Sequence, residues 1–141
     1  MRLSVTRLRP SVPLPVYATA GAAGFDLAAA EDLVIGAGAI QLVGTGLVFA
    51  IPEGFFLAII ARSSTPLKRG LVLANGVGVL DSDYRGPTDE LKLQLLNITA
   101  SPIQITAGDR LAQGIILQAP RVSFVETTTS APSRGGFGST G

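Results

Sequence analysis

The chain has 141 residues, of which 47% are hydrophobic and only 15% are charged. This length suits one domain with a substantial core, and the scarcity of charges predicts an apolar surface that is covered in an oligomer. With 11 basic and 10 acidic residues the net charge is +1, and no basic cluster marks a nucleic-acid surface. The sequence contains no Cys and no His, which excludes disulfides, the usual zinc sites, cysteine nucleophiles and histidine bases. A carboxylate must therefore perform any acid–base chemistry near neutral pH.

The hydropathy of the sequence gives no sign of a membrane protein. No stretch approaches the roughly 18 uninterrupted apolar residues of a spanning helix, and the first residues lack the apolar run of a signal peptide. We therefore expect a cytoplasmic protein that has no membrane partner.

Short apolar segments, separated by Gly, Pro, Asp or Asn, follow one another along the chain. They are rich in β-branched residues, and turn signals such as Asn75-Gly76 recur about every ten residues. This spacing is typical of a β-sandwich or barrel, so we predict an all-β domain. The expected strands are residues 3–8, 33–35, 40–43, 47–51, 55–60, 71–73, 91–98, 111–117 and 122–125.

One segment, residues 63–70, departs from this pattern. Ser63 and Ser64 offer hydroxyl caps, Pro66 suits the first helical turn, and Gly70 is a typical helix stop. We expect a helix of about two turns here, and it is the only helix predicted.

The chain after Glu126 is rich in Thr, Ser, Pro and Gly, which divides it into a β domain, residues 1–126, and a flexible arm, residues 127–141. A Gly-rich end taken alone indicates a frayed spacer. This arm, however, carries Arg134, the aromatic ring of Phe137 and a row of unhindered backbone N–H groups. Such groups stack on rings and bind phosphates, so we expect the arm to close over a phosphorylated ring compound.

The segment 75–86 combines paired glycines with a short apolar run, which predicts a hairpin whose backbone approaches a ligand closely. Asp81 directly follows the apolar run, so we expect its carboxylate at a pocket floor, where it would activate a water molecule. Tyr84 would pack flat against a sugar. The alternative interpretation of the segment is an acidic surface turn.

Other polar positions have structural explanations when each is taken alone. Arg62 precedes the helix start, whose N–H groups bind anions, but a solvated cation beside an ordinary cap is the alternative. Asp26 lies among small apolar residues, either as a turn residue bound to local backbone or as a carboxylate that holds the water shell of Mg²⁺. Asp109 and Arg110 pair opposite charges before a strand, which is typical of a structural turn.

Five short motifs occur in order between Ala23 and the last residue. They are Ala23-Gly24-Phe25-Asp26-Leu27, Arg62-Ser63-Ser64 with Lys68 and Gly70, residues 75–86, residues 108–113 and residues 135–141. Together they resemble the trimeric deoxyuridine triphosphatases, or dUTP diphosphatases. Each motif alone is weakly specific, whereas five in this order are highly specific.

The resemblance implies a jelly-roll protomer of the β-clip type and a threefold homotrimer with active sites at the subunit interfaces. It also implies Mg²⁺-assisted hydrolysis of dUTP to dUMP and pyrophosphate, which keeps uracil out of DNA and supplies dUMP for thymidylate synthesis. Asp81 would orient the attacking water, and Asp26 would hold Mg²⁺ through water. The substrate-binding residues implied are Arg62, Ser63, Ser64, Asn75, Gly78, Leu80, Tyr84, Lys92, Gln113, Arg134, Phe137, Gly138, Ser139 and Thr140.

The chain departs from the usual family pattern at three places. Thr65-Pro66 replaces the usual Leu-Ala, and residues 87–90, Pro-Thr-Asp-Glu, form an additional turn. The family usually has an Arg five residues before the Phe, at the position of Pro132, whereas Arg134 lies three residues before Phe137. We expect a flexible arm to absorb this shift.

Two rival functions remain open. A dCTP deaminase, alone or bifunctional, shares the fold and an Arg-Ser-Ser element, but it needs a Glu that acts at the cytosine ring. Glu90 lies near that region, although out of register. The second rival is a binding or regulatory protein that uses a nucleotide-bound trimer as its scaffold, and the presence of Asp81, Arg62 and the complete tail disfavours it.

Overall fold

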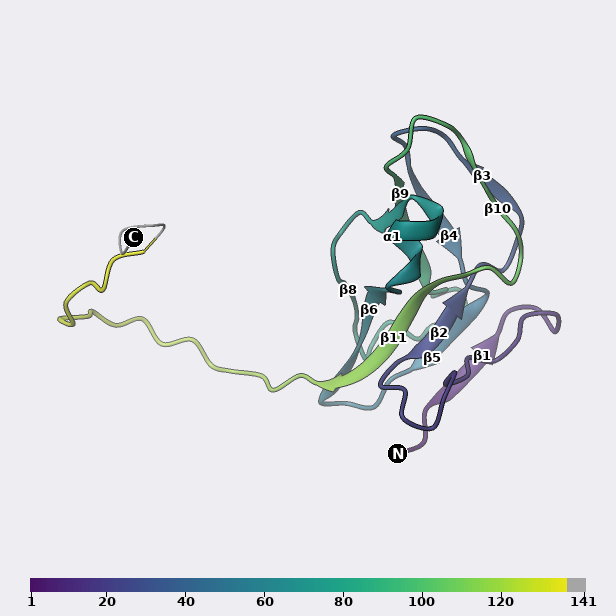
Figure 1. Cartoon of the computed structure of the whole chain (residues 1–141). Coiled ribbons are helices and arrows are strands. Elements are labelled where there is room, and N and C mark those ends of the chain that lie inside the picture. Colours follow the sequence, from purple (N-terminus) through teal and green to yellow (C-terminus); the bar gives the residue numbers. More distant parts are fainter. Residues whose placement is uncertain (137–141) are drawn as a thin grey trace.

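Strands make up almost all of the regular structure in the computed structural model, which describes residues 1–136. The strands are β1 (Ser4–Arg7), β2 (Phe25–Ala28), β3 (Leu33–Ile35), β4 (Ile40–Gly44), β5 (Leu47–Ala50), β6 (Phe55–Ala61), β7 (Leu71–Leu73), β8 (Gly78–Leu80), β9 (Lys92–Asn97), β10 (Ile103–Ile105) and β11 (Arg110–Gln118). The helix α1 (Ser64–Arg69) joins β6 to β7 (Figure 1). No helix within residues 1–136 is long and apolar enough to cross a membrane. The predicted all-β domain with one short helix is confirmed.

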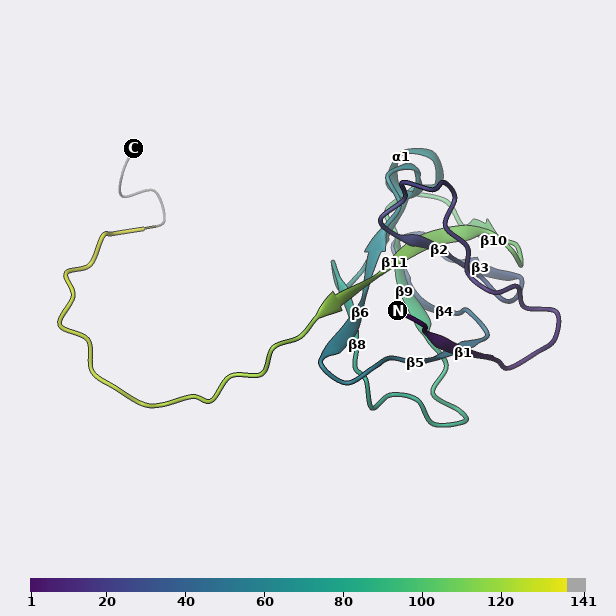
Figure 2. The ribbon, with the colours of Figure 1, turned by 90° about the horizontal axis from the view of Figure 1, so that it is seen from below.

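The strands form four small antiparallel sheets around one core. Their orders are β2-β11-β6-β8, β4-β9-β7, β1-β5 and β10-β3. Seen from below, the sheets surround a common interior (Figure 2), which holds the fully buried side chains of Leu27, Ile35, Phe49 and Leu57. Over the first four residues of β9 the alternation of apolar and polar residues matches the alternation of burial, because Leu93 and Leu95 point inward while their neighbours are more exposed.

β11 lies between β2 and β6 and brings distant segments together. Its Gln113 is paired with Asp26 on one side and with Ile60 on the other. At the next residue, Gly114, a Cβ would lie 2.7 Å from the ring of Phe25, so only glycine allows this packing. The sheet thus places Asp26, Gln113 and the end of β6 side by side.

The helix agrees with the prediction, but its capping does not. Ser63 has helical backbone angles (φ −54°, ψ −33°) and makes no side-chain capping hydrogen bond within the described residues. The hydroxyl of Thr65 instead donates to the carbonyl of Leu111 at 3.0 Å, which ties α1 to β11. Gly70 ends the helix at φ 62°, where a Cβ would clash with Thr99. Thr65, and not Ser63, is therefore the hydroxyl that fixes the helix.

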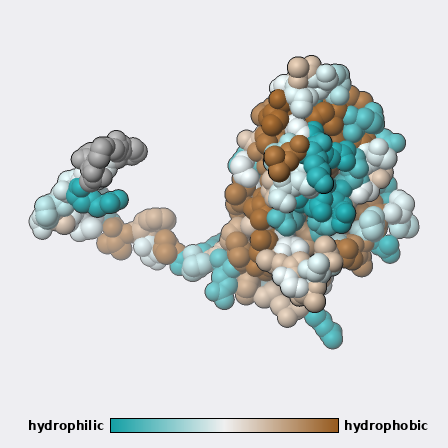
Figure 3. Space-filling view, in the orientation of Figure 1, coloured by the Kyte–Doolittle hydropathy of each residue, from teal (hydrophilic) through white to brown (hydrophobic). Residues whose placement is uncertain are grey.

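The strand predicted at residues 122–125 is wrong for the single chain. The amide of Ala119 donates to the carbonyl of Gly54 at 2.8 Å, and residues 120–136 then run away from the domain without helix or strand (Figures 1 and 2). A strand needs a ladder partner, and no segment of residues 1–136 pairs with this one. The chain leaves the β domain after Ala119, before the predicted boundary at residue 126. The segment 120–136 carries a hydrophobic stretch (Figure 3), in which Phe124 is 95% exposed.

Three observed strands, β2, β8 and β10, were not predicted as strands. β2 contains no β-branched residue, and β8 and β10 have only three residues each. Short strands carry a weak local signal, because their stability comes from the neighbours they pair with. The alternation Ile-Gln-Ile in β10 is the one signal that pointed to a strand.

Candidate active site

A cavity of about 370 Å³ lies beside β8 and reaches Leu42 of β4. Six of the residues singled out in the sequence line this β8 cavity: Asn75, Gly78, Leu80, Asp81, Tyr84 and Lys92. The fold therefore brings the segment 75–86 together with the start of β9.

A tight turn and a glycine give the β8 cavity its backbone wall. Gly76 has φ 71°, and its amide donates to the carbonyl of Leu73 at 3.0 Å. At Gly78 a Cβ would lie 3.1 Å from the Cβ of Ile59, so glycine lets β8 lie close to β6. The predicted hairpin is wrong in one respect: β7 pairs with β9 whereas β8 pairs with β6, so the turn links two different sheets. Which strands pair is thus decided by packing across the core and not by the turn.

Asp81 lies directly after β8, where the β8 cavity meets a second cavity of about 630 Å³. In the single chain its side chain is exposed and does not sit at a buried floor, because β8 is the edge strand of its sheet. The amide of Tyr84 donates to the carbonyl of Asp81 at 3.3 Å, so one turn carries both side chains to the same cavity. Tyr84 is 43% exposed, which leaves it accessible to a ligand.

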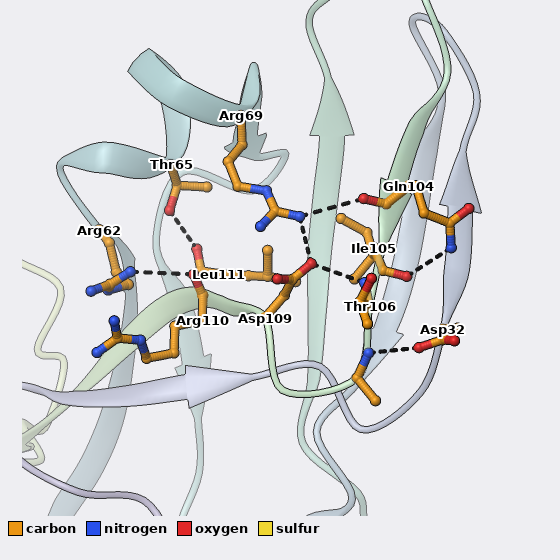
Figure 4. A network of polar contacts seen from close by, with 11 residues as sticks. Asp32, Arg62, Thr65, Arg69, Gln104, Ile105, Thr106, Asp109, Arg110 and Leu111 are labelled. Atoms are coloured by element: carbon orange, nitrogen blue, oxygen red, sulfur yellow. Dashed lines mark hydrogen bonds and ion pairs between the residues drawn. The ribbon is translucent and has the colours of Figure 1, made fainter.

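Asp26 holds two arginines, and we call Asp26, Arg62, Arg110 and Gln113 the Asp26 cluster. Its Oδ1 pairs with Nε of Arg62 at 2.8 Å, and its Oδ2 pairs with Nη1 of Arg110 at 3.0 Å. Nη1 of Arg62 also donates to the carbonyl of Arg110 at 3.4 Å (Figure 4). The alternative of a turn Asp bound to local backbone is therefore wrong. A carboxylate that is only 12% exposed orients two guanidinium groups, which suits them to bind phosphate oxygens.

Gln113 belongs to the Asp26 cluster because of strand register. It lies opposite Asp26 in the ladder, so both side chains are on the same face of the sheet. Its Nε2 donates to the carbonyl of Ala61 at 3.3 Å. At Gly24 a Cβ would lie 3.2 Å from Oε1 of Gln113, so glycine leaves room for this amide. Residues of three separate motifs are thus brought together.

A small basic cavity of about 240 Å³ adjoins the Asp26 cluster. Arg62, Ser64, Lys68, Arg69 and Arg110 are among its lining residues. Ser63, the remaining residue of the motif, is exposed beside it. The basic cavity and the β8 cavity have no lining residue in common.

A second ion pair, which the sequence did not predict, fixes the loop before β11. The predicted structural turn is present, since the amide of Asp109 donates to the carbonyl of Thr106 at 2.9 Å. Asp109 pairs with Arg69 of α1 and Arg110 pairs with Asp26, so these two neighbours do not pair with each other. The same carboxylate accepts a hydrogen bond from the amide of Thr106 at 2.9 Å (Figure 4). The hydrogen bond with Arg69 lowers the pKa of Asp109 and raises the pKa of Arg69. Opposite charges at positions 69 and 109 were visible in the sequence, but nothing local connects them.

The metal prediction has a limited structural basis. Within residues 1–136 no group of three or more His, Cys, Asp or Glu side chains is placed to hold a metal ion. Both oxygens of Asp26 already bind guanidinium groups. A Mg²⁺ ion beside Asp26 would therefore be held through water.

The predicted residues of the arm are distributed on both sides of the last described residue. Arg134 is exposed and is not among the residues that line the β8 cavity or the basic cavity. Phe137, Gly138, Ser139 and Thr140 lie outside the described residues.

Sequence comparison identifies relatives over the whole chain. The dUTPase family model matches residues 11–141. The deoxyuridine 5'-triphosphate nucleotidohydrolase of Thermobifida fusca is 43% identical over 145 residues, which cover 100% of this chain and 79% of that protein. The protein of the same name from Wolinella succinogenes is 42% identical over 144 residues, covering 100% of this chain and 95% of that protein.

Comparison with solved structures also finds dUTPases. The dUTPase of Streptococcus mutans superposes with a TM-score of 0.79 at 36% identity, over 86% of this chain and 98% of that chain. The dUTPase of Staphylococcus bacteriophage 80alpha, solved with dUPNHPP, gives a TM-score of 0.83 at 25% identity, over 99% and 98% of the two chains. This likeness confirms the expected jelly-roll fold of the β-clip type. The chain belongs to the dUTPase family.

Proposed function

We propose that this protein is a dUTP diphosphatase, which hydrolyses dUTP to dUMP and pyrophosphate. The observation that carries the proposal is the β8 cavity, because it gathers five expected substrate-binding residues beside the carboxylate of Asp81. The Asp26 cluster supplies the cationic groups that a triphosphate requires. The two regions suit the two halves of one nucleotide.

Backbone groups would read the base. The turn at Asn75 and the strand from Gly78 to Leu80 offer N–H and C=O groups that match the edge of uracil, together with the Asn75 amide. Cytosine would leave such groups unpaired, which is costly in a buried site, and a tight fit at C5 would exclude the methyl group of thymine. Tyr84 would pack against deoxyribose and leave no room for a 2′-hydroxyl. Lys92, at the cavity wall, would also contact the substrate.

The Asp26 cluster would hold the phosphates. Arg62 and Gln113, with the hydroxyls of Ser63 and Ser64, would contact phosphate oxygens or the attacking water, and their positive charge would offset charge that develops on the leaving pyrophosphate. When bound to the triphosphate, Mg²⁺ supplies further positive charge to that leaving group. Asp26 would hold its water shell while keeping Arg62 and Arg110 in place.

Asp81 would act on the water. Its carboxylate would accept a proton as the water oxygen forms a bond to the α-phosphorus and the bond from that phosphorus to the bridging oxygen breaks. It is the only ionisable carboxylate among the six predicted residues of the β8 cavity. The products would be dUMP, which supplies thymidylate synthesis, and pyrophosphate, and removal of dUTP would keep uracil out of DNA.

The complete site would be shared in a homotrimer. The β8 cavity and the basic cavity share no lining residue, so separate copies can supply the nucleoside half and the phosphate half. The segment 120–136 leaves its own domain with Phe124 and Val125 exposed, which favours contact with a second copy. Phe137 would then cover the uracil, and Arg134, Gly138, Ser139 and Thr140 would meet the phosphates. We place the enzyme in the cytoplasm.

The test is a pyrophosphate-release assay with Mg²⁺ across all deoxynucleoside triphosphates and UTP, followed by the native mass of the protein. We expect release from dUTP alone and a mass of three chains. Equal release from dTTP or dCTP would contradict the proposal. Release of ammonia from dCTP would instead support the deaminase, for which Glu90 in the cavity wall is the relevant carboxylate.

A further inference from the structure

We propose that Glu90, the last residue of the additional turn 87–90, is a positioning residue that sets the sugar selectivity of the β8 cavity. The inference rests on the proposed function, because it concerns the nucleoside half of the same site. Glu90 is half-buried and lines the β8 cavity together with Tyr84 and Lys92. The additional turn is therefore part of the cavity and not a remote insertion.

Glu90 is bound to the bend between β4 and β5. Its Oε1 accepts the amide hydrogen of Gly46 at 2.7 Å, although 44 residues separate the two. Gly46 has φ 67°, and at Gly44 a Cβ would lie 2.6 Å from the same carboxylate oxygen. Gly44 thus leaves room for the carboxylate, whereas Gly46 adopts the positive φ of the bend that presents its amide. A hydrogen bond to a charged acceptor is among the stronger kinds. The contact fixes one end of the additional turn.

The rest of the turn is closed by its own hydrogen bonds. The amide of Gly86 donates to Oδ2 of Asp89 at 2.7 Å, and the amide of Asp89 donates to the carbonyl of Gly86 at 3.1 Å. The amide of Glu90 donates to the carbonyl of Thr88 at 2.8 Å. Beyond Glu90, the amide of Leu91 donates to the carbonyl of Leu47 at 2.8 Å. The chain between Tyr84 and Lys92 is therefore a rigid connection attached to the core.

The position of Tyr84 depends on this connection. Tyr84 is 43% exposed, so packing within the chain holds its ring only in part, and the segment that follows must fix the depth of the ring in the cavity. If Gly46 loses its acceptor, the segment 85–90 gains freedom and the ring can retreat. A retreat by the width of one hydroxyl group admits ribose. We therefore expect the loss of this contact to weaken selectivity against UTP more than it weakens the binding of dUTP.

The test compares Glu90→Ala with Glu90→Gln in the full-length enzyme, with dUTP and UTP as substrates. E90A removes the acceptor, so we expect the ratio of kcat/KM for dUTP to that for UTP to fall about tenfold or more, and KM for dUTP to rise more than kcat falls. E90Q keeps an acceptor oxygen at the same reach and recovers most of the selectivity. Thr88→Ala is the matched control, because this exposed side chain lies in the same turn, and its ratio stays at the wild-type value.

Each result of this experiment leads to a different conclusion. A role in stability alone would lower Tm in E90A without changing the dUTP to UTP ratio, and this result would overturn the inference. If E90A does not fold, Asp89→Ala removes the acceptor at the other end of the turn and is expected to lower the same ratio. A wild-type protein that does not hydrolyse dUTP contradicts the proposed function itself. Ammonia release from dCTP that E90Q abolishes would make Glu90 catalytic, and it would also overturn the positioning role.

Discussion

The β8 cavity is shaped by backbone, whereas the Asp26 cluster is held by charged side chains. Gly76 with its positive φ and Gly78 against Ile59 bring main-chain groups to the cavity surface. In the Asp26 cluster, by contrast, one carboxylate orients Arg62 and Arg110 across three strands. The first region should therefore respond to changes of volume and the second to changes of charge, pH and salt. A nucleotide needs both, because its base is recognised by shape and hydrogen bonds and its phosphates by charge.

The largest effect is expected from Asp81→Asn, since the role proposed for this residue in the β8 cavity is chemical and not one of shape. We expect kcat to fall by about a thousandfold while dUTP still binds within a few-fold of the wild type, because Asn keeps the volume but cannot take a proton. Pyrophosphate release and titration calorimetry measure the two quantities. Asp83→Asn, an exposed neighbour, is the control. Normal turnover in D81N would exclude Asp81 as the base.

Deletion of residues 131–141 tests whether the two regions need the arm to act on one substrate. We expect turnover to fall about a hundredfold, since an open site loses phosphate contacts and admits water. The native mass should remain that of the trimer, because the hydrophobic stretch around Phe124 is retained. An unchanged rate would make the arm a spacer.

Asp26→Asn breaks the cluster without changing the cavity. Arg62 and Arg110 lose the charge that holds them side by side, so we expect KM for dUTP to rise about tenfold and to depend more steeply on salt. Base and sugar selectivity should stay as in the wild type. A change of selectivity in D26N would show that shape and charge are not divided between the two regions.

The smallest effect is expected from Asp109→Asn, which tests the support behind the cluster. Because Arg69 lowers the folded-state pKa of Asp109, the pair stabilises the fold fully above the unfolded-state value of about 3.9. This stability is lost as the pH falls through the lower folded-state pKa. We expect D109N to lose on the order of 1 kcal/mol of unfolding free energy at pH 7, with the difference narrowing below about pH 3.9.

Urea unfolding at several pH values measures this effect. Glu31→Gln is the control, since the Arg9–Glu31 pair is longer, at 3.6 Å, and its side chains are 47% and 58% exposed. We expect no measurable change there. An equal loss in both variants would mean that the Arg69–Asp109 pair is an ordinary surface pair.

Local features were predictable and long-range partners were not. Eight of the predicted strands overlap observed ones closely enough to place the turns between them, and the helix ends at Gly70 as expected. The strand at residues 122–125 failed because a strand needs a partner that the single chain does not offer. Ser63 does not cap the helix as predicted, and the hydroxyl of Thr65 instead donates to a carbonyl on β11. In both cases the presence or absence of a tertiary partner, and not the local preference, decided the outcome.

The sequence by itself determined the β class, the single helix and the motif residues, because turn chemistry and alternation are properties of neighbouring residues. Only the tertiary structure decided the partners: Asp26 with an arginine 84 residues away, Asp109 with Arg69 across 40 residues, and Glu90 with Gly46 across 44. These pairs depend on strand register, and register is fixed by how the whole core packs.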